Sequence, residues 1–196
     1  NSRPLLRLAT RATCSLASQV LCISRSLEAE VVRTNLCPAF KVKTLANGSG
    51  NGLDAETLFN PALMSSETRN KIRGMLGIPH EALVVGFLVR IVREKGIVEL
   101  MAACQTIRQQ FPHAHLVLVG PLENTDPLPA STLSQIKSDS RVHSAGEHTD
   151  PRPMLTAMDV LAVPSYREGL GMAAIEAAAM ELPVIATRIS GCTDAV

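Results

Sequence analysis

The stretch "DVLAVPSYREGLGMAAIEAAAMELPVIATR", residues 159–188, places an alanine-rich segment between two short apolar runs. Each run has the length and the β-branched content of a buried strand, and the segment between them has the composition of a helix. A strand, a helix and a second strand in this order form the unit from which parallel sheets are built. This stretch therefore predicts an α/β fold.

The same alternation of strands and helices extends over most of the chain. We predict strands at 82–88, 115–119, 141–144, 159–163 and 183–187, and helices near 66–76, 96–110, 131–138, after Pro153 and at 171–180. Near-continuous apolar strands separated by helices indicate a doubly wound, Rossmann-like parallel sheet that is covered on both faces. Within the helix at 96–110, Val98, Met101, Cys104 and Ile107 recur at helical spacing and predict a stripe that faces the core.

A turn-rich segment, "ANGSGNGLDAETLFNP" at 46–61, contains two Asn-Gly pairs and predicts a linker. Before it we expect helices near 5–17 and 26–34 and strands at 19–23 and 41–45. We therefore predict two domains. Residues 1–46 are the C-terminal remnant of an N-terminal domain, and residues 47–196 form an incomplete second domain. The chain begins without Met and stops after a strand that an α/β unit would continue into a helix, so we expect a piece truncated at both ends.

Composition excludes several classes of protein. A net charge of +1, an aromatic content of 3% and the lack of Trp argue against a nucleic-acid-binding protein. The five cysteines form no CxxC pair, which favours reduced, buried thiols in a cytosolic chain. No apolar run approaches the roughly 20 residues that cross a bilayer. Residues 1–27 are arginine-rich without an acidic residue, like an organellar transit peptide, but "QVLCIS" at 19–24 indicates a strand, not a cleavage site.

The loop after the strand at 82–88 carries Arg90, Arg93, Glu94 and Lys95, followed by Gly96. In an open parallel sheet, ligands bind beyond the carboxyl ends of the strands, so this loop is a candidate site. Cations at a helix start oppose the helix dipole, unless a phosphate lies between them and the backbone N–H groups. The alternative is a solvated charge cluster that is paired with Glu94.

A second candidate loop follows the strand at 159–163. Gly169 and Gly171 bracket a turn into the next helix, where the lack of Cβ atoms lets a ligand approach the backbone N–H groups. Glu168 lies at the turn and Glu176 lies eight residues further on, a span that suits a nucleotide sugar. The alternative is a capping Glu168 and an unrelated Glu176 on the helix surface.

Five stretches together carry a family resemblance: "LANGSGNGLD", "GFLVRIVREKG", "HLVLVG", "RVHSAGEH" and "MDVLAVPSYREGLGMAAIEAAAMELPVIATRISG". In this order they resemble the nucleotide-sugar-binding half of retaining GT-B glycosyltransferases of the glycosyl-transferases-group-1, glycogen-synthase-like family. The resemblance covers residues 41–196, and "QVLCISRSLE" at 19–28 is similar to the end of that family's N-terminal domain.

The resemblance implies a role for individual residues in binding the donor. Arg90 and Lys95 match the pair that holds the donor diphosphate and stabilises the leaving phosphate. Glu168 matches the glutamate that touches the donor sugar, in a positioning role, and Glu176 matches the one that binds the ribose hydroxyls. Gly169, Leu170 and Gly171 match the turn whose backbone amides face the sugar and phosphate. His148 matches a loop that borders the nucleobase.

One position departs from the family pattern, since Glu181 stands where a glycine is usual before the Leu-Pro turn. The chain also has no Asp-x-Asp motif, so we expect neither a metal nor a cofactor. The resemblance implies retaining transfer from a nucleotide sugar, with a UDP-sugar favoured, to a glycan or lipid-linked acceptor in bacterial surface polysaccharide synthesis. We expect a cytoplasmic protein, at the inner face of the membrane through its N-terminal domain, and a piece that is inactive alone.

Three other functions stay open at this point. A sugar-nucleotide epimerase of the same architecture would take its acid and base from residues upstream of this chain. A dinucleotide-dependent dehydrogenase is disfavoured, because "GSGNG" at 48–52 lies in the linker and no GxGxxG follows the first strand. A non-catalytic nucleotide-binding module is the third. The sugar, the base, the acceptor and the linkage are not identified by the sequence.

Overall fold

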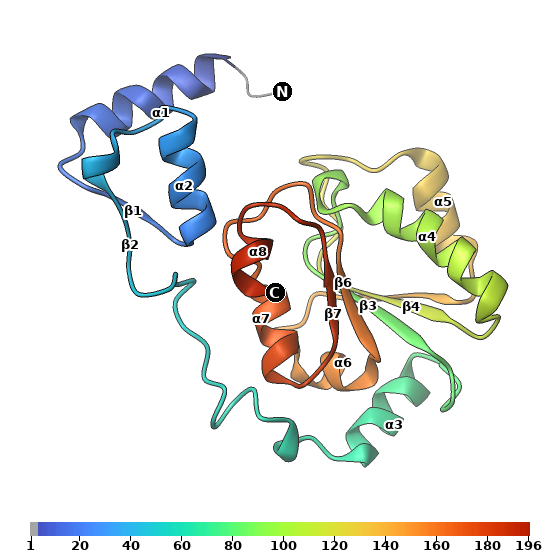
Figure 1. Ribbon diagram of the computed structural model, residues 1–196. Coiled ribbons are helices and arrows are strands. Elements are labelled where there is room, and N and C mark those ends of the chain that lie inside the picture. The colour runs from blue at the N-terminus through green and yellow to red at the C-terminus, as the bar shows by residue number, and fades with distance from the viewer. Residues whose placement is uncertain (1–3) are drawn as a thin grey trace. The chain divides into compact units, whose positions relative to one another are not determined.

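A computed structural model describes residues 4–196, and the chain forms two units (Figure 1). The first contains the residues up to Gly52 together with Arg167–Met172 and Arg188–Val196, and the second contains Leu53–Tyr166 and Ala173–Thr187. These units group residues by contact, so the predicted domain boundary between residues 46 and 47 stays a prediction.

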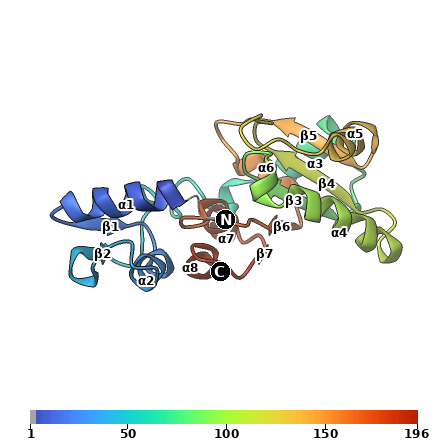
Figure 2. The same cartoon turned by 90° about the horizontal axis from the view of Figure 1, so that it is seen from above.

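The first unit is built around two parallel strands, β1 (Val20–Cys22) and β2 (Val42–Thr44). Figure 2 shows the helices α1 (Pro4–Leu16) and α2 (Arg25–Arg33) flanking this strand pair. Its small core contains the side chains of Cys14, Cys22, Cys37 and Val42. Two short helices complete the unit, η1 (Ala39–Lys41) and α8 (Cys192–Ala195).

Contacts between distant parts of the sequence close the first unit. The backbone N–H of Ser26 donates to Asp194 Oδ1 at 3.1 Å, and the backbone N–H of Gly191 donates to the Ser26 hydroxyl at 2.6 Å. The end of the chain is thereby joined to the start of α2.

The second unit contains a five-stranded parallel sheet in the order β5-β4-β3-β6-β7, which confirms the predicted fold class. The strands are β3 (Val84–Leu88), β4 (His115–Val119), β5 (Val142–Gly146), β6 (Val160–Val163) and β7 (Val184–Ala186). All five predicted strands of the proposed sheet are present within two residues of their expected bounds. The helices of this unit are η2 (Pro61–Leu63), α3 (Ser66–Met75), η3 (Arg93–Lys95), α4 (Ile97–Gln110), α5 (Ala130–Ser138), α6 (Arg152–Ala157) and α7 (Met172–Ala179), whose first residue belongs to the first unit.

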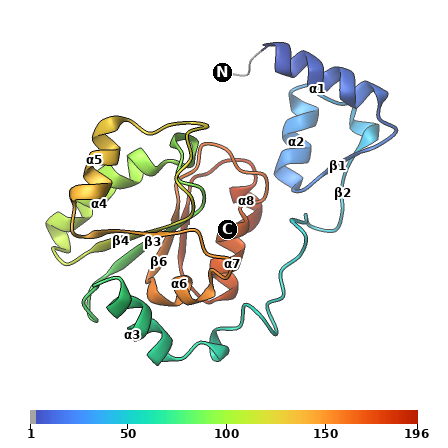
Figure 3. The same cartoon turned by 180° about the vertical axis from the view of Figure 1, so that it is seen from behind.

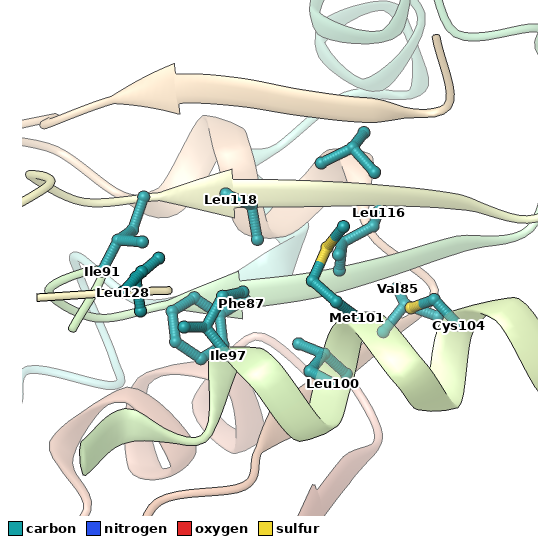
Figure 4. Close-up of a cluster of buried hydrophobic side chains, with 11 residues drawn as sticks. Val85, Phe87, Ile91, Ile97, Leu100, Met101, Cys104, Leu116, Leu118 and Leu128 are labelled. Atoms are coloured by element: carbon teal, nitrogen blue, oxygen red, sulfur yellow. The ribbon is translucent and has the colours of Figure 1, made fainter. Parts of the chain in front are cut away.

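The main core lies between the sheet and α4, as Figure 4 shows. Phe87 and Ile97 are fully buried there, and Met101 and Cys104 of the predicted stripe lie in the same cluster. Met101 is therefore a core residue, as its spacing predicted. All five cysteines of the chain are free and buried, which confirms the prediction of buried thiols, whereas their reduced state stays a prediction.

Figure 3 shows α3 at one end of the sheet. A buried arginine of this helix fastens it to the amino ends of the strands. Arg73 is 2% exposed, donates to Asp159 Oδ2 at 2.9 Å and also donates to the carbonyl oxygens of Ala157 and Ala82. The same Asp159 oxygen accepts the backbone N–H of Val84 at 2.7 Å. A single carboxylate thus joins α3, β3 and β6 at the edge opposite to the candidate site.

The departure at Glu181 has a structural consequence, because this residue adopts a φ of +56°. Only glycine occupies that left-handed region without a steric penalty. The turn therefore keeps the backbone geometry that suits the family's usual glycine, although a glutamate occupies it. Among residues 4–196, no helix is long and apolar enough to span a membrane.

Candidate donor-binding site

The loop after β3 is held along its length by the last residue of β4 and the loop after it. The backbone N–H of Val89 donates to Val119 O at 3.1 Å and that of Ile91 donates to Pro121 O at 2.8 Å. Further on, the N–H of Arg93 donates to Asp126 O at 3.1 Å, and that of Glu94 donates to the Asp126 carboxylate at 2.6 Å. The position of the predicted cationic loop is therefore set by residues 119–126.

Arg90 lies on this loop with its side chain 47% exposed and its guanidinium between two carboxylates. It donates to Glu123 Oε2 at 2.9 Å and lies 3.7 Å from Glu94 Oε1. The hydrogen bond from Arg90 and a second one from Thr125 lower the pKa of Glu123 below its usual value. The ion pair with Glu94 that the alternative interpretation assumed is therefore present, and Arg90 also makes a shorter contact with Glu123.

Lys95 is the last residue of η3, and only 9% of it is exposed. The next residue, Gly96, has a φ of +76°, and a Cβ atom there would lie 2.1 Å from Pro164 O. The loop after β3 and the end of β6 are therefore in direct backbone contact. Tyr166 strengthens this contact, because its N–H donates to Glu94 O at 2.9 Å and its hydroxyl donates to Glu99 Oε1 at 2.8 Å.

Glu176 lies in the middle of α7, between the fully buried Ala174 and Ala177. Burial raises the pKa of its carboxyl group above the usual value. Within residues 4–196, no hydrogen bond or ion pair of its carboxylate is found, and no fully buried side-chain oxygen lacks a partner, so the carboxylate oxygens keep contact with solvent. A half-buried carboxylate without a partner costs free energy, and such groups are enriched at binding sites. This environment differs from the helix-surface position that the alternative interpretation assumed.

The turn at Glu168–Gly171 is grouped with the first unit, whereas Arg90, Lys95, His148 and Glu176 belong to the second. Gly171 has a φ of +65° and directly precedes α7, so this position favours glycine, as the turn prediction required. A Cβ atom at Gly169 would lie 2.4 Å from the Ile23 side chain, and Leu170 is buried. The turn is therefore closely packed within its own unit.

His148 follows β5, is exposed, and forms a hydrogen bond between its Nε2 atom and Ala145 O at 3.0 Å. It thus lies at the carboxyl end of the sheet, where ligands of parallel sheets bind. In the part of the chain that the structure describes, no group of three or more His, Cys, Asp or Glu side chains could hold a metal ion. Independence of metals stays a prediction.

Two residues near the predicted cations were not found from the sequence. Glu123 pairs with Arg90, and Asp126 binds the backbone of η3. Both follow β4, and the carboxyl ends of adjacent parallel strands meet at one edge of the sheet. The sequence does show acidic residues after "HLVLVG". They indicate partners for the cationic loop only once β3 and β4 are known to be neighbours in the sheet.

The parallel sheet, with a cationic loop at the carboxyl ends of its strands, is typical of α/β proteins that bind ligands at this end of the sheet. Residues 82–196 match the model of the family "Glycosyl transferases group 1". The chain belongs to this family.

Curated relatives agree with this assignment. Over 180 residues the chain is 31% identical to the capsular polysaccharide biosynthesis glycosyltransferase CapM of Staphylococcus aureus, covering 92% of this chain and 46% of CapM. Over 127 residues it is 37% identical to the putative teichuronic acid biosynthesis glycosyltransferase TuaC of Bacillus subtilis, covering 65% of this chain and 30% of TuaC. The chain thus spans less than half of either relative.

Among solved structures, HepE of Anabaena in complex with UDP-glucose has a TM-score of 0.77 and 24% identity to this chain. The match covers 100% of this chain and 52% of HepE. It supports the fold, which is that of GT-B glycosyltransferases.

Proposed function

We propose that this chain is the donor-binding part of a glycosyltransferase that takes a sugar from a nucleotide sugar, with a UDP-sugar as the favoured donor. The observation that carries the proposal is the loop after β3, which presents Arg90 and Lys95 at the carboxyl end of the sheet in the region that matches the family. HepE, which shares the fold, was crystallised with UDP-glucose.

Each predicted residue has a chemical role in this proposal. Arg90 and Lys95 bind the diphosphate and stabilise the negative charge that develops as the bond between sugar and phosphate breaks. The carboxylate of Glu176 accepts hydrogen bonds from the ribose hydroxyls, which supply the partner that it lacks among residues 4–196. Glu168 positions the donor sugar, the amides of Gly169–Gly171 face the sugar and phosphate, and His148 borders the base.

We further propose that transfer proceeds with retention, by attack on the same face that the leaving phosphate vacates, and without a metal. No enzymic nucleophile is assigned in this mechanism. CapM and TuaC act in capsular polysaccharide and teichuronic acid biosynthesis according to their names, which favours a glycan or lipid-linked acceptor in surface polysaccharide synthesis. The acceptor site would then lie outside this chain, with the protein at the cytoplasmic face of the membrane.

The test is a thermal-shift series on the 196-residue chain with UDP, GDP and ADP, the matching nucleoside monophosphates, and the nucleotide sugars. A ligand that binds only the folded state at 100 times its Kd stabilises it by about 2.7 kcal/mol. We expect one nucleoside diphosphate to raise the midpoint and the matching nucleoside monophosphate to raise it less, because the monophosphate lacks the second phosphate. No shift with any of the three diphosphates would contradict the proposal.

A further inference from the structure

Arg90 and Glu123 form an ion pair between the loops that follow two neighbouring strands. The Arg90 guanidinium donates to Glu123 Oε2 at 2.9 Å, and the Thr125 hydroxyl donates to the same oxygen at 3.0 Å. Strands β3 and β4, from which the two loops leave, are adjacent in the sheet. The pair is therefore part of the loop structure that presents the candidate diphosphate site.

A guanidinium has a limited set of N–H donors in one plane, and it binds carboxylates and phosphates in the same way. An Arg90 side chain that is paired with Glu123 has one of its terminal nitrogen atoms engaged. A diphosphate that binds Arg90 at the same nitrogen atom comes next to the Glu123 carboxylate, and two anions beside one guanidinium repel each other. The carboxylate and the phosphate therefore compete for Arg90 through their charge, although each terminal nitrogen carries two N–H donors.

We propose that Glu123 is an internal competitor of the donor diphosphate for Arg90. This inference rests on the proposed function, because it assumes that Arg90 binds a diphosphate. Binding of the nucleotide exchanges the Glu123 carboxylate for a phosphate, and the return of Glu123 to Arg90 assists release of the nucleoside diphosphate after transfer.

The exposure of the pair suits such an exchange. The side chain of Arg90 is 47% exposed and that of Glu123 is 29% exposed. Water therefore screens the pair, and exposed ion pairs contribute little to stability. A phosphate, which carries more charge than a carboxylate, can displace Glu123 without disrupting the fold.

The position of Glu123 does not depend on its ion pair. The neighbouring Leu122 forms a β-bridge with Ile91, and the Thr125 hydroxyl donates to the same Glu123 oxygen that Arg90 binds. When Arg90 turns to a phosphate, Glu123 stays beside it and is available when the phosphate leaves. Glu94, the other carboxylate near Arg90, is 3.7 Å away and is the weaker competitor.

A different role for Glu123 predicts the opposite result. If Glu123 only orients Arg90 for the nucleotide, its removal weakens binding. If Glu123 competes with the phosphate, its removal tightens binding. The sign of the change therefore distinguishes the two roles.

The experiment is calorimetric titration of the full 196-residue chain with UDP, for the unsubstituted chain and for Glu123→Gln. We expect Glu123→Gln to bind UDP roughly two- to five-fold more tightly, the range that corresponds to an exposed ion pair. The dissociation rate of UDP, measured by stopped flow, should fall by a similar factor. The matched control is Glu81→Gln, which removes the same charge from an exposed side chain before the amino end of β3 and should leave the Kd unchanged.

A double-mutant cycle tests whether the effect acts through Arg90. In an Arg90→Ala chain, Glu123→Gln should no longer tighten binding, because the competition has been removed. Thr125→Val, which loosens the Glu123 carboxylate without removing it, should tighten binding by a smaller factor. Circular dichroism and the thermal midpoint verify that each variant is folded.

Two results would overturn the inference and leave the proposed function intact. Equal or weaker binding by Glu123→Gln would show that the glutamate does not compete, and tightening that persists without Arg90 would show a general effect of charge. If UDP, GDP and ADP all fail to bind the unsubstituted chain, the proposed function fails and the inference fails with it. Binding by the unsubstituted chain with no gain in Glu123→Gln refutes the inference alone.

Discussion

Glu176 is the residue at which stability and binding conflict. Burial raises the pKa of its carboxyl group, so the folded chain binds the proton more tightly than the unfolded chain does. The contribution of Glu176 to stability is therefore most favourable at low pH, and it declines as the pH rises through the unfolded pKa of about 4.3 and then through the raised folded pKa. A side chain that costs stability at neutral pH is typical of a functional site.

We expect Glu176→Gln to stabilise the chain at pH 7, because glutamine has the same shape without the charge. The gain should disappear below the unfolded pKa of about 4.3, where glutamate is protonated in both states. Urea denaturation at pH 7 and near pH 4 measures both effects, with Glu181→Gln, an exposed carboxylate just beyond the same helix, as the control. Loss of stability at pH 7 would show that the charge has a partner in the fold.

The two glutamates of the donor site should differ in their effect on UDP. Glu176→Ala should weaken binding of UDP and UDP-sugar alike, by about 1.5–3 kcal/mol if a charge-assisted hydrogen bond to the ribose is lost. Glu168→Ala should leave UDP binding nearly unchanged and impair sugar transfer in the intact enzyme, because its partner exists only when the sugar is present. Equal losses of UDP affinity would contradict this division of roles.

The cationic loop makes a third prediction at the scale of single residues. Arg90→Ala and Lys95→Ala should each weaken UDP binding by about 1.5–3 kcal/mol, the cost of one charge-assisted contact. Arg93→Ala should cost less, since its side chain is exposed and it matches no donor-binding position of the family. Titration calorimetry compares the three variants, and equal losses would favour a solvated charge cluster.

At the scale of elements, the short turn η3 depends on Gly96. This glycine ends η3 and begins α4 in the left-handed region, and a Cβ atom on it would collide with Pro164 O. The close approach of η3 to the end of β6 is therefore possible only for a residue without a side chain. Asp126 fixes the other end of η3 through the N–H of Glu94.

Alanine substitutions at three glycines separate two costs at Gly96: the cost of a left-handed backbone and the cost of a collision between the new Cβ atom and Pro164 O. Gly74→Ala, within α3 and facing open space, should stabilise the chain by up to about 1 kcal/mol. Gly77 has a φ of +68°, and a Cβ atom there would meet no other atom. Gly77→Ala should therefore lower the free energy of unfolding by about 1–2 kcal/mol. Gly96→Ala adds a 2.1 Å contact with backbone and should cost more than Gly77→Ala and also weaken UDP binding. Chemical denaturation gives the ranking, and an equal cost at Gly77 and Gly96 would argue against the collision.

At the scale of the whole molecule, a histidine pair makes stability depend on pH. The rings of His115 and His143 are stacked at the amino ends of β4 and β5, with Nδ1 and Nε2 2.8 Å apart. Burial is the main cause that lowers the pKa of both groups, and the neighbouring Arg108 lowers both further, whereas Asp139 acts in the opposite direction. The hydrogen bond requires that one of these two nitrogen atoms carries a proton and that the other does not. The pair therefore resists protonation of the second nitrogen atom.

Because both pKa values are lower in the folded chain, the stability that the pair contributes is present above the unfolded pKa of about 6.5 and is lost as the pH falls through the lowered values. Each histidine adds at most about 1.4 kcal/mol per pH unit to this loss. We expect His143→Gln to flatten the decline of the thermal midpoint below pH 6.5. His80→Gln, at a side chain that is 63% exposed, is the control and should leave the slope unchanged.

The helices and strands could be predicted from the sequence because they depend on local patterns. The apolar runs at 82–88 and 159–163 and the helical spacing of Met101 and Cys104 are properties of adjacent residues, and the structure confirms them. The resemblance also identified Arg90, Lys95 and Glu176, since a family motif is read along the chain. Their proposed roles depend on chemistry that the binding and transfer experiments test.

Only the tertiary structure decided which of these residues have partners. Arg90 meets Glu123 from a loop 33 positions away, because β3 and β4 are neighbours in the sheet. Glu176 has no counter-ion within residues 4–196, and its burial depends on how α7 packs rather than on the residues beside it in the sequence. Likewise, Asp194 reaches Ser26 across 168 positions. The sequence by itself determined the elements and the candidate residues, whereas charge pairing and burial were decided by the fold, because they arise between residues that only folding brings together.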